Sequence, residues 1–361
     1  MQIAAERLDR VVRMILKAGG SSEAEIADVA GHLVESNLQG HDSHGVMLLP
    51  RYVENVQSGK LKPNQGIEVV GGGGVIQVVD GGMGYGQTIG RAAMNHVIPI
   101  AREQGLAVLA LRNVHHLGRI GAYGEMAAAA GLISIHFVNG LSGAPPVAPF
   151  RGSDGRMSTN PVCIAIPASE TGGKPMILDF ATSAIAIGKV RVAYNAGKQV
   201  PAGALVDGYG KPTTDPSVMY EADPRGALQS MGAHKGYGLA VMCEILGGAL
   251  TGGGTAQPKN SRERGIRNGM LAILLDPARF VDIGYFSEEV AALIAHVKAS
   301  PAANPSEPVL VAGENERINK AKRSTEGIPI DQKTWSLIRG AAKSLGISDT
   351  DFDNAAGNLG P

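Results

Sequence analysis

Short apolar runs alternate with longer helix-like stretches through the middle of the chain, from residue 75 to about residue 180. The short runs are rich in valine, isoleucine and leucine, and the longer stretches repeat apolar residues at helical spacing. This alternation is typical of α/β layer proteins, in which helices cover a sheet. We therefore expect strands at 75–80, 106–111, 133–138, 162–166, 176–180 and 270–275, and helices at 88–104, 120–130 and 238–250, the last of them buried.

Helical patterns flank this region at both ends of the chain. The apolar stripe in residues 8–16 is followed by Gly19 and Gly20, which favour a helix end, and Ser22 with Glu25 makes a capping box for a second helix. Further helices are expected at 48–56 and 332–345. Because the last of these carries an apolar face, we expect it to pack beside the N-terminal helices.

These patterns divide the chain into two parts. We expect a discontinuous helical domain, residues 1–75 plus 305–361, around an α/β domain of residues 76–304. Within the α/β domain, segments 195–233 and 252–268 are rich in Gly, Pro and Asp, and they are expected to be long surface excursions.

Charge and cysteine content exclude several classes of protein. The 361 residues include 33 basic and 33 acidic ones, so no net charge favours nucleic acid or an anionic membrane. Cys163 and Cys243 lie in apolar runs and cannot build a disulfide framework, which favours a reducing compartment. The N-terminal residues lack the basic and apolar regions of a signal peptide, and no apolar run approaches the roughly 20 residues that span a bilayer. We therefore expect a cytoplasmic protein with neither nucleic-acid nor membrane partners.

Two histidine-bearing loops are the strongest candidates for chemistry. His115 and His116 follow the expected strand 106–111 in a glycine-lined loop, and residues 40–45 form a second loop of similar composition with two more histidines. Imidazole has a pKa of about 6.5, so it can take up and return a proton near neutral pH. A single loop histidine is more often bonded to a nearby carbonyl group, but two such loops favour a functional interpretation.

Three other kinds of site fit the sequence poorly. Residues 82–90 follow a strand and open a helix as a dinucleotide-binding loop does, but the glycine spacing is wrong and Arg112 stands where an acidic residue would bind the ribose. We expect a tight turn that lines a site instead. Ser43 beside His44 suggests a nucleophile and a base, but adjacent side chains rarely face each other and no nucleophile elbow surrounds them, so a hydrolase is not expected. The histidine spacing matches no zinc signature, so no metal is expected.

The roles of two further polar positions stay open. Lys235 lies between glycines ahead of an apolar helix, where it could contact a phosphate or ribose or simply be solvated. Asp179 ends a strand and is followed by Thr182 and Ser183, a pattern that suits either a helix cap or a nucleotide contact.

Taken in order along the chain, these motifs resemble the type-2 malate/L-lactate dehydrogenase family. That family also includes ureidoglycolate, sulfolactate and diketogulonate oxidoreductases and the piperideine-2-carboxylate reductases. The resemblance spans nearly the whole chain and rests on residues 40–45, 115–121, 159–161, 179–183, 188–190, 212–216 and 234–238.

The resemblance implies hydride transfer between NAD or NADP and a 2-hydroxy acid/2-oxo acid pair, in a homodimer. It also implies that the α/β part is a non-Rossmann, mixed-sheet cofactor domain, as in sulfolactate dehydrogenase. By motif, His116 is the acid/base on the substrate hydroxyl, and Ser43 and His44 complete the reacting pocket. The resemblance further implies that Thr159 lies near the substrate and that Asn139 or Gly140 contacts the nicotinamide. The other cofactor contacts that it implies are Asp179, Phe180, Ala181 and Lys235.

Two positions depart from the family pattern. Leu48 stands where many members have an arginine that binds the substrate carboxylate. Because a carboxylate still needs a bidentate cation, Arg119 is the first candidate to replace it and Arg51 the second. Leu48 would also favour a substrate with a bulky or aromatic side chain. Lys189 stands where the imine reductases carry an aspartate, so reduction of cyclic imines or N-alkyl imino acids is the less favoured alternative. A non-catalytic nucleotide-binding protein is a further alternative.

Overall fold

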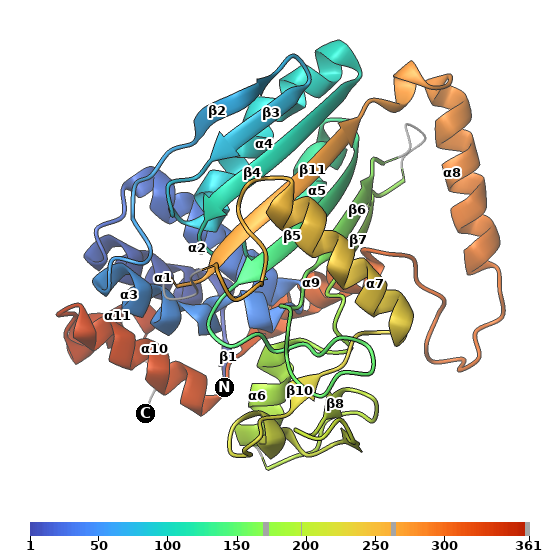
Figure 1. Cartoon of the computed structure of the whole chain (residues 1–361). Helices are drawn as coiled ribbons and strands as arrows, with labels where there is room; N and C mark the ends of the chain where they lie inside the picture. The colour runs from blue at the N-terminus through green and yellow to red at the C-terminus, as the bar shows by residue number, and fades with distance from the viewer. Residues whose placement is uncertain (169–172, 196, 261–264, 358–361) are drawn as a thin grey trace.

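The computed structural model describes residues 1–168, 173–195, 197–260 and 265–357, and its centre is a seven-stranded mixed sheet (Figure 1). Every neighbouring pair of strands is antiparallel except β3 and β4, which run parallel. This confirms the α/β, non-Rossmann architecture, because a Rossmann sheet is mostly parallel. In spatial order the strands are β2 (Glu68–Gly73), β3 (Ile76–Asp80), β4 (Leu106–Val114), β11 (Arg267–Leu275), β5 (Ile133–Leu141), β6 (Val162–Ile166) and β7 (Met176–Phe180).

The sequence pattern located the strands of this sheet well, with one omission. β6 and β7 have the predicted bounds, while β4 and β5 continue beyond the predicted ends, to Val114 and Leu141. The edge strand β2 was not predicted, because half of it is glycine and its strand conformation comes from pairing with β3.

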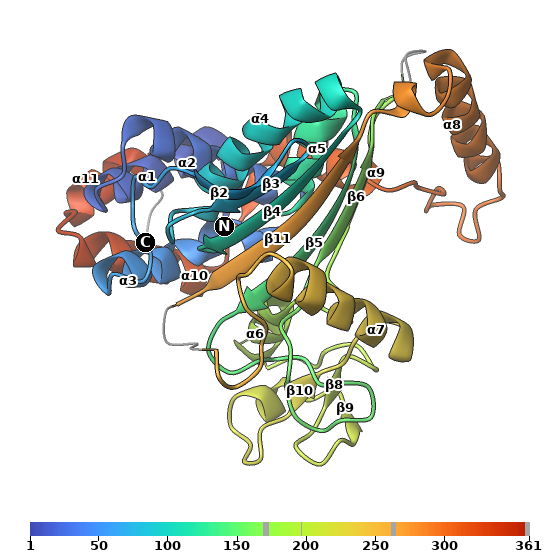
Figure 2. The same ribbon diagram turned by 45° about the horizontal axis from the view of Figure 1, so that its top comes forward.

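Two helices cover one face of the sheet (Figures 1 and 2). They are α4 (Gly86–Gln104) and α5 (Gly121–Ala129), and their apolar residues share a core with alternate residues of the strands. The alternation along each strand places every second side chain in this core and sends the others to the opposite face.

Among the described residues, one helix covers the opposite face, near one end of the sheet. This is α7 (His234–Cys243), which continues into a π-helical turn, Glu244–Ala249. The turn packs so closely on β5 that a Cβ at Gly247 would lie 2.8 Å from the carbonyl oxygen of Phe137. The prediction that this helix is buried is wrong: Met242, Ile245 and Leu250 are exposed, because only one side of the helix faces the sheet.

Helices from both ends of the chain form a second core beside the sheet. As predicted, the C-terminal helix α10 (Gln332–Ser344) packs with the N-terminal helices, and its Trp335 lies in that core. Ser22 caps the second N-terminal helix as expected, accepting a hydrogen bond from the backbone N–H of Glu25. The helices of this core are α1 (Ala5–Ala18), α2 (Glu23–Leu38), α3 (Leu49–Gln57), α10 and α11 (Asp349–Ala356); the short strands β1 (Gln2–Ile3) and β12 (Ile328–Pro329) pair beside them.

One of the two expected surface excursions has its own small core. Within 195–233, β8 (Leu205–Val206), β9 (Pro212–Thr213) and β10 (Ala227–Leu228) form a three-stranded sheet below helix α6 (Ile187–Asn195). Leu205, Met219 and Leu228 are buried there, so the segment is a folded unit. The second expected excursion is residues 252–268. Its residues 261–264 lie outside the described part of the chain, and β11 already begins within it, at Arg267.

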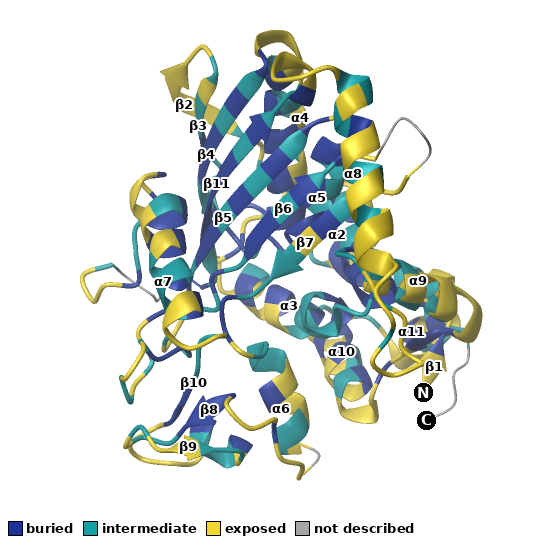
Figure 3. Cartoon of the chain, turned by 90° about the vertical axis from the view of Figure 1, so that its right-hand side faces the viewer, coloured by how far each residue is buried: buried dark blue, intermediate teal, exposed yellow. Residues whose placement is uncertain are grey.

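Two helices follow β11, the last strand of the seven-stranded sheet along the chain, and the sequence analysis did not locate either. Helix α8 (Ile283–Lys298) stands apart from the sheet in Figures 1 and 2, and α9 (Glu314–Glu326) returns to lie beside α2. Figure 3 shows that α8 is almost without buried residues. Within the described residues no helix combines the length and the apolar character needed to cross a bilayer.

Candidate active site

A cavity of about 290 Å³ lies where the ends of β4 and β5 meet the helical part of the molecule. Its walls contain every predicted site residue except Arg51 and Lys235. The predicted residues in its lining are Ser43, His44, Leu48, His116, Arg119, Asn139, Gly140, Thr159, Asp179, Phe180 and Ala181.

His116 occupies this cavity with one ring nitrogen already engaged. The hydroxyl of Tyr52 lies 2.7 Å from its Nδ1, and the Nε2 amide of Gln87 donates to the same hydroxyl at 2.8 Å. Burial, reinforced by the neighbouring histidines, holds the pKa of His116 well below its usual value. The imidazole is therefore neutral at pH 7 and able to accept a proton.

The neighbouring His115 has a different environment. It is fully buried, and its Nε2 lies 2.9 Å from the side-chain amide of Asn55. Consecutive side chains at a strand end point to opposite sides, so only His116 reaches the cavity. Burial lowers the pKa of His115 to about 3, which makes it a neutral structural group.

The backbone after His116 is held by polar contacts from two other elements, α2 and β11. Gly118 has φ +76°, and a Cβ there would lie 2.4 Å from Nε2 of His32, which itself accepts the backbone N–H of Arg119. Asn268 on β11 accepts the backbone N–H of Leu117 at 2.9 Å and donates to the carbonyl of Asn139 on β5. These contacts fix the height of the imidazole over the sheet.

Ser43 and His44 form a second polar wall of the cavity. They lie in a short 3₁₀ turn, and Ser43 Oγ is 3.1 Å from His44 Nδ1, so the expectation that these adjacent side chains would not face each other is wrong. The tight 3₁₀ turn brings the two side chains together. The His44 ring stacks on His116 at a centroid distance of 5.7 Å, and burial lowers the pKa of His44 to about 4.

The turn at 82–90 packs against the backbone of His116. A Cβ at Gly86 would lie 2.2 Å from the carbonyl oxygen of His116, so only glycine allows this approach. The expected tight turn is present, but the prediction that it lines a site is not confirmed, because no residue of 82–90 is part of the cavity wall. The same turn supplies Gln87, which the sequence analysis missed although it directly follows Gly86. Tyr52 was missed as well; its signal was the spacing of four from Leu48, which places both on one helix face.

Asp179 lines the cavity and also caps a helix. Its Oδ2 accepts the backbone N–H of Gly121, the first residue of α5, at 2.6 Å. Burial raises its pKa, while this hydrogen bond and the nearby Arg119 act in the opposite sense. The helix-cap interpretation therefore holds for this aspartate, on α5 rather than on the helix that follows its own strand.

A larger cleft of about 610 Å³ adjoins the cavity and shares part of its wall. The shared residues include Ser43, His44, Asp179, Phe180 and Ala181. The two spaces form one elongated depression, which suits a ligand much longer than a small acid.

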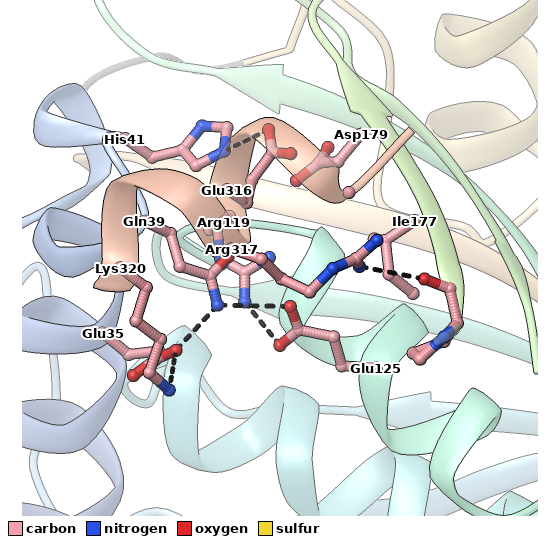
Figure 4. A pocket seen from close by; sticks show the side chains of 12 residues that line it. Glu35, Gln39, His41, Arg119, Glu125, Ile177, Asp179, Glu316, Arg317 and Lys320 are labelled. Atoms are coloured by element: carbon pink, nitrogen blue, oxygen red, sulfur yellow. Dashed lines mark hydrogen bonds and ion pairs between the residues drawn. The ribbon is translucent and has the colours of Figure 1, made fainter. Parts of the chain in front are cut away.

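Arg119 separates the cavity from a further, charged pocket of about 240 Å³ (Figure 4). The residue is 3% exposed, and its Nη2 lies 2.6 Å from a carboxylate oxygen of Glu125 in that pocket. Figure 4 shows the other pairs around it, Lys320 with Glu35 and His41 with Glu316. The guanidinium is thus partly neutralised from the outer side.

Arg51 and Lys235, the two remaining predicted residues, do not line the cavity. Arg51 is exposed on α3 and pairs with Glu54 at 3.3 Å, one helical turn away. Lys235 is exposed in the first turn of α7. In both cases the helix face on which the residue lies points away from the cavity. The described residues hold no group of three or more His, Cys, Asp or Glu side chains suited to a metal ion.

Comparison with known proteins agrees with this geometry. A family model described as malate/L-lactate dehydrogenase matches residues 3–339. The chain belongs to the malate/L-lactate dehydrogenase family. It is 42% identical to hydroxycarboxylate dehydrogenase B of Escherichia coli O157:H7 over 347 residues, covering 96% of this chain and 94% of the relative.

Solved structures of the malate/L-lactate dehydrogenase family have the same fold. A structure from E. coli assigned as a malate/lactate dehydrogenase matches with a TM-score of 0.94 at 40% identity and covers 99% of both chains. Sulfolactate dehydrogenase from Methanocaldococcus jannaschii matches with a TM-score of 0.83 at 32% identity, covering 97% of this chain and 99% of that one. The protein is therefore an oxidoreductase of a hydroxy acid dehydrogenase family.

Proposed function

We propose that this protein transfers a hydride between NAD or NADP and a 2-hydroxy acid/2-oxo acid pair, with His116 as the acid/base. The observation that carries the proposal is the neutral imidazole of His116 in a cavity, with Nδ1 engaged by Tyr52 and Nε2 left for a substrate. A base on the hydroxyl is what the oxidation of an alcohol by hydride loss needs.

The residues of the depression fit a dinucleotide. At the junction of cavity and cleft the walls come close together, and a Cβ at Gly188 would lie 3.0 Å from Cβ of Ser43, so glycine keeps this passage open. Asn139, Gly140, Phe180 and Ala181 would hold the cofactor beside His116. When bound, the nicotinamide ring would supply hydride acceptance and donation, and the protein supplies position and charge.

The hydrogen bonds around Tyr52 support one tautomer of His116. Gln87 Oε1 is buried without a partner, whereas its Nε2 faces the Tyr52 hydroxyl. Amide oxygen and nitrogen are assigned from their partners, and exchanging them lets Tyr52 donate to Gln87 Oε1. Tyr52 then accepts a hydrogen bond from His116 Nδ1–H, and Nε2 presents its lone pair to the cavity.

With this tautomer the proton path is short. Nε2 of His116 takes the hydroxyl proton as the alcohol is oxidised, and the resulting imidazolium is stabilised by its Nδ1–H bond to Tyr52. In the reverse direction the same nitrogen returns the proton to the developing alkoxide. Ser43 and His44 hold the substrate oxygen from the other wall.

For the substrate carboxylate we propose Arg119, which is the one permanent cation among the described residues of the cavity wall. Its pairing with Glu125 leaves part of its charge for a second carboxylate. Leu48 makes the adjacent wall apolar, which supports a substrate with a bulky or aromatic side chain. The other partner that we propose is a second copy of the chain, as the family resemblance implies.

A spectrophotometric screen tests this proposal. Reduced nicotinamide should form from NAD or NADP with a 2-hydroxy acid and be consumed with the matching 2-oxo acid alone. Consumption only when an amine accompanies the oxo acid would replace the proposal with imine reduction. No change with any substrate would reject both reactions.

A further inference from the structure

Glu244 is a buried carboxylate that the reaction proposed above does not use. It is 6% exposed, and it is the one charged residue in the sequence between Lys235 and Lys259. It begins the π-helical turn that continues α7, and single π turns of this kind are frequent at functional sites. Burying a charge in such an apolar stretch is costly unless donors surround it and it has a use.

Three neutral donors meet this carboxylate. The side-chain amide of Asn160 donates to Oε1 at 2.9 Å, and the backbone N–H of Ala256 donates to Oε2 at 2.8 Å. The side-chain amide of Asn139 lies 3.5 Å from Oε2. A carboxylate only accepts hydrogen bonds, and all three groups donate. Because none of them carries a charge, they satisfy the oxygens without neutralising the carboxylate.

Two of these donors form or support the part of the cavity wall that is proposed to contact the nicotinamide. Asn139 lines the cavity itself, and Asn160 accepts the backbone N–H of Gly140 at 3.3 Å through its Oδ1. A Cβ at Gly248, one helical turn after Glu244, would lie 2.5 Å from Nδ2 of Asn139, so glycine lets the turn approach the wall. Glu244 therefore lies directly behind Asn139.

The same wall is tied to the histidine loop. The carbonyl of Asn139 accepts a hydrogen bond from Asn268, and Asn268 also accepts the backbone N–H of Leu117, next to His116. The carboxylate, the wall and the proposed acid/base thus belong to one network of hydrogen bonds. A change at Glu244 would act on the position of the wall relative to His116.

We propose that Glu244 is a positioning residue for the cofactor ring, and that its charge favours the oxidised ring over the reduced one. The inference rests on the proposed function, which puts the nicotinamide against Asn139 and Gly140. The oxidised ring carries a positive charge and the reduced ring is neutral, so a negative charge behind the wall attracts only the oxidised form. Burial strengthens this attraction, because little water screens it. An uncharged anchor would favour neither form.

Binding measurements on the ligand-free protein test the charge. Isothermal titration calorimetry gives the dissociation constants of the oxidised and the reduced dinucleotide, and the quantity of interest is the ratio of oxidised to reduced. In Glu244→Gln this ratio should rise about tenfold, because the attraction to the oxidised ring is lost. Glu103→Gln is the matched control: it removes an exposed carboxylate at the end of α4, before the end of β4 that is remote from the cavity, and should leave the ratio unchanged.

Glu244→Asp is the second variant, and it gives the same test if Glu244→Gln does not fold. It keeps the charge but draws it back toward the helix, so the ratio should rise by less than in Glu244→Gln. A loss of affinity that the two forms share equally would overturn the proposal, because it would leave Glu244 as a structural anchor. If the unaltered protein binds neither form, the proposed function fails. If it binds both and neither variant changes the ratio, only the role of Glu244 fails.

Discussion

The phenolic oxygen of Tyr52 lies 2.7 Å from Nδ1 of His116, although 64 positions separate the two residues in sequence. This contact decides which imidazole nitrogen is free to meet a substrate. Gln87, which is buried, extends the chain of hydrogen bonds to a third side chain.

Tyr52→Phe removes the hydroxyl and keeps the ring. A hydrogen bond to a charged group is worth about 1.5–3 kcal/mol, so losing it from the imidazolium should lower kcat about 10- to 150-fold. The pH profile of kcat should shift, and the KM for the cofactor should stay the same. Tyr85→Phe, a buried tyrosine whose ring packs edge-on against Tyr52, is the matched control. Equal effects of the two substitutions would argue for packing rather than for the Nδ1 contact.

His116→Ala removes the proposed acid/base. Because general acid–base help is typically worth about 10²–10⁴ in rate, kcat should fall by that order. Cofactor affinity, measured by nicotinamide fluorescence titration, should barely move. Turnover close to that of the unaltered protein would remove His116 from the mechanism.

His115 and His44 should make the fold sensitive to acid. Their pKa values in the folded state, about 3 and about 4, lie below the unfolded value of about 6.5. Below pH 6.5 the unfolded chain therefore binds protons that the folded one does not. The free energy of unfolding therefore keeps its full value above pH 6.5. It decreases as the pH falls toward 4, by roughly 1.4 kcal/mol per pH unit for each group.

Urea unfolding of His115→Gln between pH 7 and pH 4 isolates one of these groups. The buried carboxyl group of Asp179 has a raised pKa and acts in the opposite sense, but it is present in both proteins. The free energy of unfolding should fall less steeply with decreasing pH in the variant than in the unaltered protein, and the difference between the two slopes should correspond to one histidine. Parallel curves would show that His115 titrates normally in the fold.

Arg119→Ala tests the carboxylate contact. Loss of a bidentate cation should raise the KM for the hydroxy acid about tenfold or more and affect the KM for the cofactor little. Arg317→Ala is the control, since Arg317 lines the outer charged pocket and not the cavity. If the two variants have the same KM for the acid, the carboxylate binds elsewhere.

The amino-acid sequence by itself determined the features that depend on near neighbours. The bounds of β6 and β7, the Ser22 cap and the glycine turn before α4 follow from strand alternation, side-chain capping and backbone freedom, all of which act within a few residues. The two histidine loops were found for the same reason.

The tertiary structure decided what depends on which surfaces meet. The position of β11 between β4 and β5 and the contact of Tyr52 with His116 join segments that are distant in sequence. The exposed faces of α7 and α8 likewise depend on which segments pack against these helices. It also set Arg119 apart from Arg51, two candidates that the sequence ordered but could not place. Arg119 lies on the cavity wall and Arg51 on an outer helix face, because packing of the helical core against the sheet fixes the direction of each.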